Sequence, residues 1–105
     1  MKLTNEVYSK LAVEFFNDNH KNSKELHVGL LEEVHEVKEA IKVGTRKDLL
    51  DELGDVLWYV TVMAHCEGSS LSELMMYTLE KLEDRKLNGK KSNTKGYLTL
   101  KNNEE

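Results

Sequence analysis

The chain has no proline and a single cysteine, and each shortage excludes a class of structure. Without proline, little interrupts a helix, and a charged fraction of 32% rich in Glu and Lys favours helices over strands. One cysteine, Cys66, excludes an internal disulfide. Residues 1–10 lack the apolar segment of a signal peptide, and no apolar run approaches the roughly 20 residues that span a bilayer. We therefore expect an all-α, cytoplasmic protein with no membrane role.

The length of 105 residues is that of one small domain. We expect a single domain over residues 1–105, with a helical core over about residues 4–87 and a basic tail over residues 88–105. A small set of helices gains stability by association with a second copy. A homodimer or homotetramer is therefore predicted.

Apolar periodicity and capping residues predict two helices in the first half of the chain. Thr4 is expected to cap a helix that runs to about Asn19, and residues 17–22 read as a polar turn. Ser23 is expected to cap a second helix. Gly44 is expected to end that helix in the left-handed conformation that glycine adopts readily.

Two further helices are predicted in the second half. Thr45, with an acid three residues later, predicts a capping box that opens a helix through about Glu67. Gly68 is expected to end it. Ser70 and Glu73 predict a capping box for a fourth helix. The short connections predict an antiparallel, four-helix bundle-type domain.

Acidic residues gather in two of these segments, on either side of the break at residues 44 and 45. Spacings of three and four place them on one side of each helix. The second helix carries Glu32, Glu33 and Glu36, and the third carries Glu52 and Asp55. Like charges repel at this spacing, whereas Mg²⁺ binds through a few carboxylates and the phosphates of a substrate. The pattern predicts a metal site shared by two helices, with a solvated charged surface as the alternative.

The acidic segments, Glu32-Glu33-x-x-Glu36 and Asp51-Glu-Leu-Gly-Asp-Val-Leu-Trp58, carry a resemblance to a known family. They resemble the MazG-like branch of the all-α nucleoside triphosphate pyrophosphohydrolases. The resemblance implies hydrolysis of ribo- or deoxynucleoside triphosphates between the α- and β-phosphates, which gives a monophosphate and pyrophosphate. The implied role is house-cleaning or regulation of the nucleotide pool. It also implies Mg²⁺ as cofactor, with Mn²⁺ as a substitute. The implied metal ligands are Glu33, Glu36, Glu52 and Asp55.

Other residues have predicted roles in this reaction. Position alone makes Glu32 or Glu33 the candidate base that takes a proton from the attacking water. Basic side chains on the fourth helix are candidates to bind the leaving pyrophosphate: Lys81, Arg85 and Lys86.

Two aromatic residues and one glycine have less specific signals. Phe16 and Trp58 are candidates to stack on the nucleobase, although aromatics at helical spacing are more often part of a core. Gly54 lies inside the third helix, where glycine is unfavourable. It indicates close approach by a ligand or a neighbouring helix, or ordinary helix packing.

Three rival functions stay open at this point. The first is the related phosphoribosyl-ATP pyrophosphohydrolase. The second is a non-catalytic helical adaptor that uses the acids as a metal-stabilised interface. The third is nucleic-acid binding by the basic residues 81–101, but the net charge of -4 and the sequence pI of about 5.6 argue against it.

Overall fold

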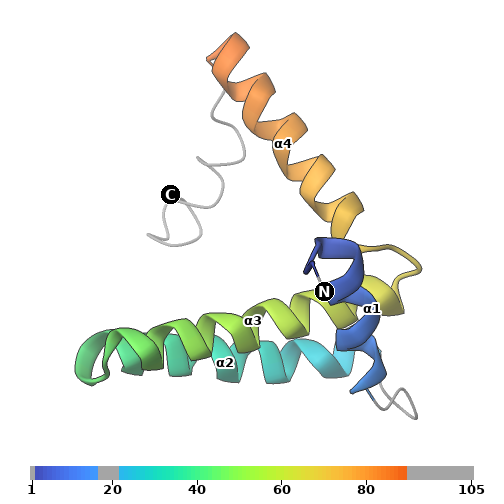
Figure 1. Cartoon of the computed structure of the whole chain (residues 1–105). Coiled ribbons are helices and arrows are strands. Elements are labelled where there is room, and N and C mark those ends of the chain that lie inside the picture. Colours follow the sequence, from blue (N-terminus) through green and yellow to red (C-terminus); the bar gives the residue numbers. More distant parts are fainter. Residues whose placement is uncertain (1, 17–21, 90–105) are drawn as a thin grey trace. The chain divides into compact units, whose positions relative to one another are not determined.

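The computed structural model describes residues 2–16 and 22–89, which form four helices (Figure 1). The helices are α1 (Asn5–Glu14), α2 (Ser23–Val43), α3 (Arg46–Cys66) and α4 (Leu71–Asn88). The described residues include no strand, so the all-α prediction is confirmed. None of these helices has the length and apolar character needed to cross a membrane. Most of the predicted basic tail, from residue 90 onward, lies outside the described residues.

The chain divides into two compact units, residues 1–74 and 75–105. In the first unit, α2 and α3 lie side by side as a helical hairpin, and α1 packs against α3 (Figure 1). The second unit contains most of α4. The prediction of a single domain stays a prediction.

Helix α1 begins as expected but ends early. Thr4 is its N-cap, and the Thr4 hydroxyl accepts a hydrogen bond from the backbone N–H of Val7 at 3.1 Å. The prediction that the helix reaches Asn19 is wrong, because it ends at Glu14. The N–H groups of Phe15 and Phe16 bond to carbonyls three residues back, which tightens the last turn and ends the α-helical pattern.

Helix α2 ends at Gly44 as predicted, but its predicted N-cap and the predicted conformation of Gly44 need correction. The N-cap is Asn22, whose side chain accepts a hydrogen bond from the Glu25 N–H at 2.9 Å. Ser23 is the first helical residue instead. At the other end, Gly44 has an extended backbone with φ -99° and ψ -177°, so the left-handed stop is wrong. Glycine is needed there for space, since a Cβ would lie 2.9 Å from the carbonyl oxygen of Ala40.

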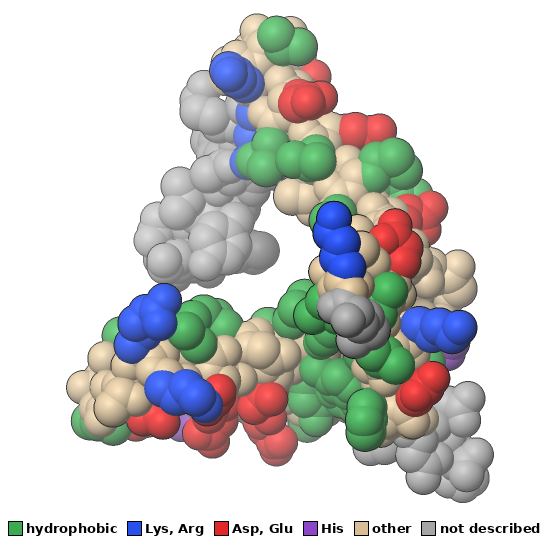
Figure 2. Space-filling model, viewed as in Figure 1, with side chains coloured by type: hydrophobic (Ala, Val, Ile, Leu, Met, Phe, Trp, Pro, Cys, Tyr) green, Lys and Arg blue, Asp and Glu red, His purple; other side chains and the backbone are tan. Residues whose placement is uncertain are grey.

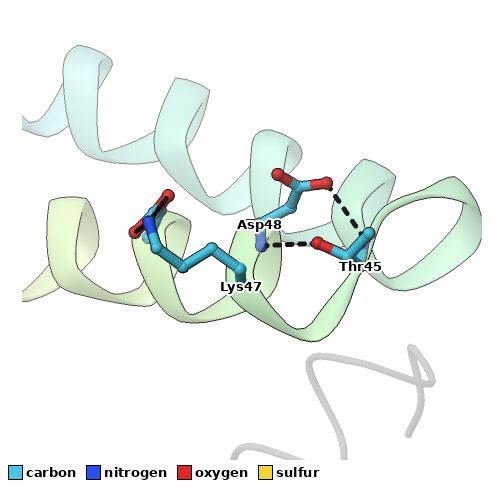
Figure 3. Close-up of polar contacts among 4 residues, drawn as sticks. Thr45, Lys47 and Asp48 are labelled. Atoms are coloured by element: carbon cyan, nitrogen blue, oxygen red, sulfur yellow. Dashed lines mark hydrogen bonds and ion pairs between the residues drawn. The ribbon is translucent and has the colours of Figure 1, made fainter.

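The capping predictions for the second half of the chain agree better with the structure. Thr45 and Asp48 form a complete capping box at the start of α3 (Figure 3). Gly68 follows α3 with φ 73°, the left-handed conformation expected at a helix end. The Ser70 hydroxyl accepts a hydrogen bond from the Glu73 N–H at 3.1 Å, as expected for an N-cap of α4.

The buried core of the first unit lies where α1 and the start of α2 meet the end of α3. Among the described residues, the buried ones are Ala12, Leu26, Thr61, Val62 and Ala64. None of residues 27–60, which include most of the α2–α3 hairpin, is fully buried. The packing that fixes the helices therefore lies at one end of the hairpin.

Candidate metal centre

The hairpin brings three predicted metal ligands together. Glu33 projects from α2, and Glu52 and Asp55 project from α3. One carboxylate oxygen from each lies within 4.8 Å of the other two. The predicted meeting of the two acidic segments is confirmed for these three residues, which we call the carboxylate cluster.

Local hydrogen bonding at the turn aligns the two acidic segments. Helix α2 ends at Val43 and the capping box begins α3 at Arg46, so only Gly44 and Thr45 connect them. A two-residue connection leaves the helices antiparallel and in contact. Segments on either side of the turn therefore face each other along the hairpin.

The carboxylate cluster raises the pKa of Glu33 above its ordinary value of 4.5. Partial desolvation is the largest cause, followed by repulsion from the charges of Asp55 and Glu52. A hydrogen bond with the Glu52 side chain and repulsion from Glu36 act in the same direction. The metal-free cluster thus disfavours full ionisation of Glu33, and a bound cation would relieve that repulsion.

Neighbouring acids on α3 are engaged in local interactions (Figure 3). The Asp48 carboxylate accepts a hydrogen bond from the Thr45 N–H at 3.0 Å, within the capping box. Lys47 forms an exposed ion pair with Asp51 at 2.8 Å, and this interaction raises the pKa of Lys47. Within residues 2–16 and 22–89, no Lys or Arg forms such a pair with the carboxylate cluster. The three clustered acids are therefore available to a cation.

Glu36 and Glu32 lie beside the cluster but are not members of it. Both are exposed, and together with Glu33 they line an open depression of about 540 Å³. Glu36 also lines a second depression of about 240 Å³ with Glu52. Figure 2 shows acidic side chains gathered along one edge of the hairpin. The role of Glu36 as a ligand and that of Glu32 as a base stay predictions.

The predicted nucleobase contacts, Phe16 and Trp58, pack at the junction of α1 and α3. The Trp58 Nε1–H donates a hydrogen bond to the carbonyl oxygen of Ala12 at 3.1 Å. The rings of Phe16 and Trp58 meet edge to face with centroids 6.4 Å apart. These contacts explain both residues as packing residues, while base contact stays a prediction.

The predicted phosphate-binding residues all lie on α4, in the second unit. Lys81 and Lys86 are exposed, and Arg85 is half-buried. Their binding to pyrophosphate stays a prediction.

Two glycines inside the hairpin have different surroundings. A Cβ on Gly54 would meet no described residue within 4 Å, so the packing explanation for this glycine finds no support within the described chain. A Cβ on Gly29 would lie 2.6 Å from three ring atoms of Tyr59. None of the sequence predictions covers this contact, although a glycine inside a helix, four residues before Glu33, was a signal for it.

The chemistry of the carboxylate cluster fits a hard divalent cation. Mg²⁺ and Mn²⁺ bind oxygen ligands, and Mg²⁺ is commonly held by one or two carboxylates plus water and substrate phosphates. Glu33, Glu52 and Asp55 lie close enough together to offer that donor set. They also leave coordination positions open to phosphate oxygens.

A comparison with protein families matches residues 21–89 to the family described as MazG nucleotide pyrophosphohydrolase domain. The matched segment contains α2, α3 and α4, and therefore the whole carboxylate cluster. Searches of curated proteins and of solved structures gave no match.

Proposed function

The chain belongs to the MazG nucleotide pyrophosphohydrolase family, and from this membership we propose that it hydrolyses nucleoside triphosphates between the α- and β-phosphates. The products would be a nucleoside monophosphate and pyrophosphate. Deoxynucleoside triphosphates are included among the proposed substrates, and the proposed role is house-cleaning of the nucleotide pool.

The observation that carries the proposal is the carboxylate cluster inside the segment that matches the family. A triphosphate brings several negative charges to a site that is itself acidic. Such a substrate can bind only if cations lie between the two sets of oxygens. The acidity of the site therefore supports a metal-dependent reaction on a phosphate substrate.

Glu33, Glu52 and Asp55 would hold Mg²⁺, with Glu36 as a further ligand from the next turn of α2. When bound, Mg²⁺ would offset phosphate charge and make a nearby water more acidic. The chain's own contribution is to orient its carboxylates from two rigid helices. Rigid placement supports in-line attack because the barrier depends on alignment of the reacting atoms.

A carboxylate of α2 is proposed to take the proton from the attacking water. Glu33 is one candidate, since its raised pKa makes it a better proton acceptor than an ordinary glutamate. Glu32 is the other, because it is exposed beside Glu33 and outside the cluster. Lys81, Arg85 and Lys86 are proposed to bind the leaving pyrophosphate, and Phe16 and Trp58 are proposed to contact the base.

The proposed working form is a homodimer or homotetramer. Large apolar side chains of the hairpin stay exposed in the single chain: Val34, Ile41, Leu50, Leu53 and Leu57. Many exposed large apolar side chains on one hairpin are typical of an interaction site. Association of copies would cover it.

The test measures release of pyrophosphate and monophosphate from a panel of canonical and damaged nucleoside triphosphates, with Mg²⁺, with Mn²⁺ and with EDTA. The panel also includes phosphoribosyl-ATP. We expect turnover of free triphosphates that requires the divalent cation and is lost in Glu36→Gln. The same assay on Glu32→Gln and Glu33→Gln, with Mg²⁺ binding measured beside it, tests the base. A Glu33→Gln protein that keeps both Mg²⁺ affinity and turnover rules out Glu33, and a Glu32→Gln protein that binds Mg²⁺ without turnover assigns Glu32.

Other outcomes would redirect the proposal. Activity on phosphoribosyl-ATP alone would indicate the related pyrophosphohydrolase. Metal-dependent assembly without any turnover would indicate an adaptor.

A further inference from the structure

A close contact between α2 and α3 lies next to the carboxylate cluster. Gly29 of α2 faces the ring of Tyr59 on α3, and a Cβ on Gly29 would lie 2.6 Å from Cε1, Cζ and Oη of that ring. Real Cβ atoms essentially never approach other atoms so closely. The ring therefore occupies space that exists because residue 29 has no side chain.

The Gly29–Tyr59 contact and the carboxylate cluster lie on adjacent turns of the same two helices. Gly29 precedes Glu33 by four residues on α2, and Tyr59 follows Asp55 by four residues on α3. Four residues span about 6 Å along a helix. A change in helix separation at the Gly29–Tyr59 contact would therefore pass almost directly to Glu33 and Asp55.

Tyr59 contacts a residue that is fixed by packing against α1. Its ring meets the Trp58 ring edge to face, with centroids 5.1 Å apart, and Trp58 is itself hydrogen-bonded to Ala12 of α1. A run of contacts thus leads from the buried core through Trp58 and Tyr59 to Gly29. The position of the ring is set by packing that does not depend on the carboxylates.

The carboxylates need such a constraint, because their charges repel one another across the two helices. Carboxylate oxygens of Glu33, Glu52 and Asp55 lie within 4.8 Å of one another, so their negative charges repel across the two helices. This repulsion favours a wider separation of α2 and α3 at the cluster. Metal ligands must instead stay in a narrow range of distances, because Mg²⁺ demands near-ideal geometry.

We propose that Gly29 and Tyr59 form a positioning pair that sets the α2–α3 separation at the metal centre and thereby tunes its affinity for Mg²⁺. The inference rests on the metal site of the proposed function. It assigns to this pair no contact with substrate or metal. Its chemistry is steric: the missing side chain of Gly29 admits the Tyr59 ring, and the ring fixes the spacing.

The experiment is a calorimetric titration of the metal-free full chain with Mg²⁺, together with far-UV circular dichroism. The set contains the native chain, Gly29→Ala, Tyr59→Leu and the double variant Gly29→Ala/Tyr59→Leu. Ala is a better helix former than Gly, so without the steric clash Gly29→Ala would leave the helix more stable. We expect instead about tenfold weaker Mg²⁺ binding or more, as for changes in residues that support metal ligands.

The double variant separates positioning from general packing. Leu lacks the three ring atoms that the new methyl group would meet, so Mg²⁺ affinity should recover relative to Gly29→Ala. A folded Gly29→Ala that binds Mg²⁺ like the native chain overturns the proposal, even if its melting temperature falls. A double variant that binds no better than Gly29→Ala also overturns it.

Two further results have defined meanings. If Gly29→Ala does not fold, the double variant decides: a folded protein that binds Mg²⁺ supports the proposal, and an unfolded one overturns it. If the native chain itself binds no Mg²⁺, the metal centre of the proposed function fails and the positioning role fails with it. If the native chain binds Mg²⁺ and the variants bind it with the same affinity, the positioning role fails but the metal centre of the proposed function stands.

Discussion

The α2–α3 hairpin differs sharply between its packed end and its acidic middle. At the packed end, α1 covers α3, and Ala12, Val62 and Ala64 are buried. In the acidic middle, residues 30–57, no side chain is fully buried and the carboxylate cluster repels itself. The packing that stabilises the hairpin and the acids that carry its chemistry therefore lie in different parts of it. Rigid packing at one end of the hairpin can hold like charges together in its acidic middle, as functional sites often require.

Loss of a carboxylate from the cluster is expected to have the greatest effect. Asp55→Asn keeps the size of the side chain but removes a charge from the carboxylate cluster. We expect turnover to fall at least about 100-fold, roughly 3 kcal/mol of transition-state stabilisation. Steady-state assays of pyrophosphate release would measure it. The matched control is Asp51→Asn, whose carboxylate pairs with Lys47 at the surface, and equal losses in both variants would contradict the assignment.

A cavity in the packed end of the hairpin is expected to have the second greatest effect. Val62 is 0% exposed, so Val62→Ala removes two buried methyl groups and leaves a cavity. We expect a loss of about 2 kcal/mol in the free energy of unfolding. Thermal denaturation at fixed protein concentration should show a melting temperature lower by roughly 10 °C. Val43→Ala, at a residue 82% exposed, should shift it very little. Similar losses at both positions would argue against the described core.

A pH experiment sharpens the contrast by probing the acidic middle alone. The pKa of Glu33 lies above 4.5 in the folded, metal-free protein. As pH rises, the Glu33 carboxyl therefore loses its proton in the unfolded chain before it does so in the folded protein. Between these two titrations the folded protein binds more protons, so the free energy of unfolding falls as pH rises. The effect is complete once the folded group has also ionised. Glu33→Gln should therefore gain stability relative to the native chain between mildly acidic and neutral pH.

The measurement is thermal denaturation in EDTA from about pH 4 to pH 8, with the native chain and Glu33→Gln side by side. Saturating Mg²⁺ should stabilise the native chain near neutral pH, because the cation binds the folded state. A stability difference that does not change with pH would mean that Glu33 titrates normally.

The smallest effect compares two glycines at the edges of these regions. Gly54 lies in the acidic middle with open space around it, so Gly54→Ala should raise the free energy of unfolding by up to about 1 kcal/mol. Gly68 follows the packed end with φ 73°, so Gly68→Ala should lower it. Chemical denaturation would measure both. Destabilisation by Gly54→Ala would indicate that another surface closes on this position in an oligomer.

Much of the local structure was predictable because it depends on interactions within a few residues. Thr4 and the Thr45–Asp48 capping box bond to groups three residues away, and Gly68 adopts the backbone that glycine favours. The errors were also local. Asn22 competes with Ser23 for the same cap, and Gly44 serves to avoid a clash instead of turning left-handed. Nearby residues with similar chemistry leave such choices open.

Periodicity and charge spacing are sufficient to predict that the chain is helical, that two helices carry acids on one side, and that a short turn pairs those helices. Which acids meet depends on the tertiary structure. Asp48 and Asp51 have local partners, whereas Glu33 gathers with Glu52 and Asp55. The distance between helices depends on side chains that interlock across the hairpin, such as Tyr59 against Gly29, and spacing along one chain does not encode that fit.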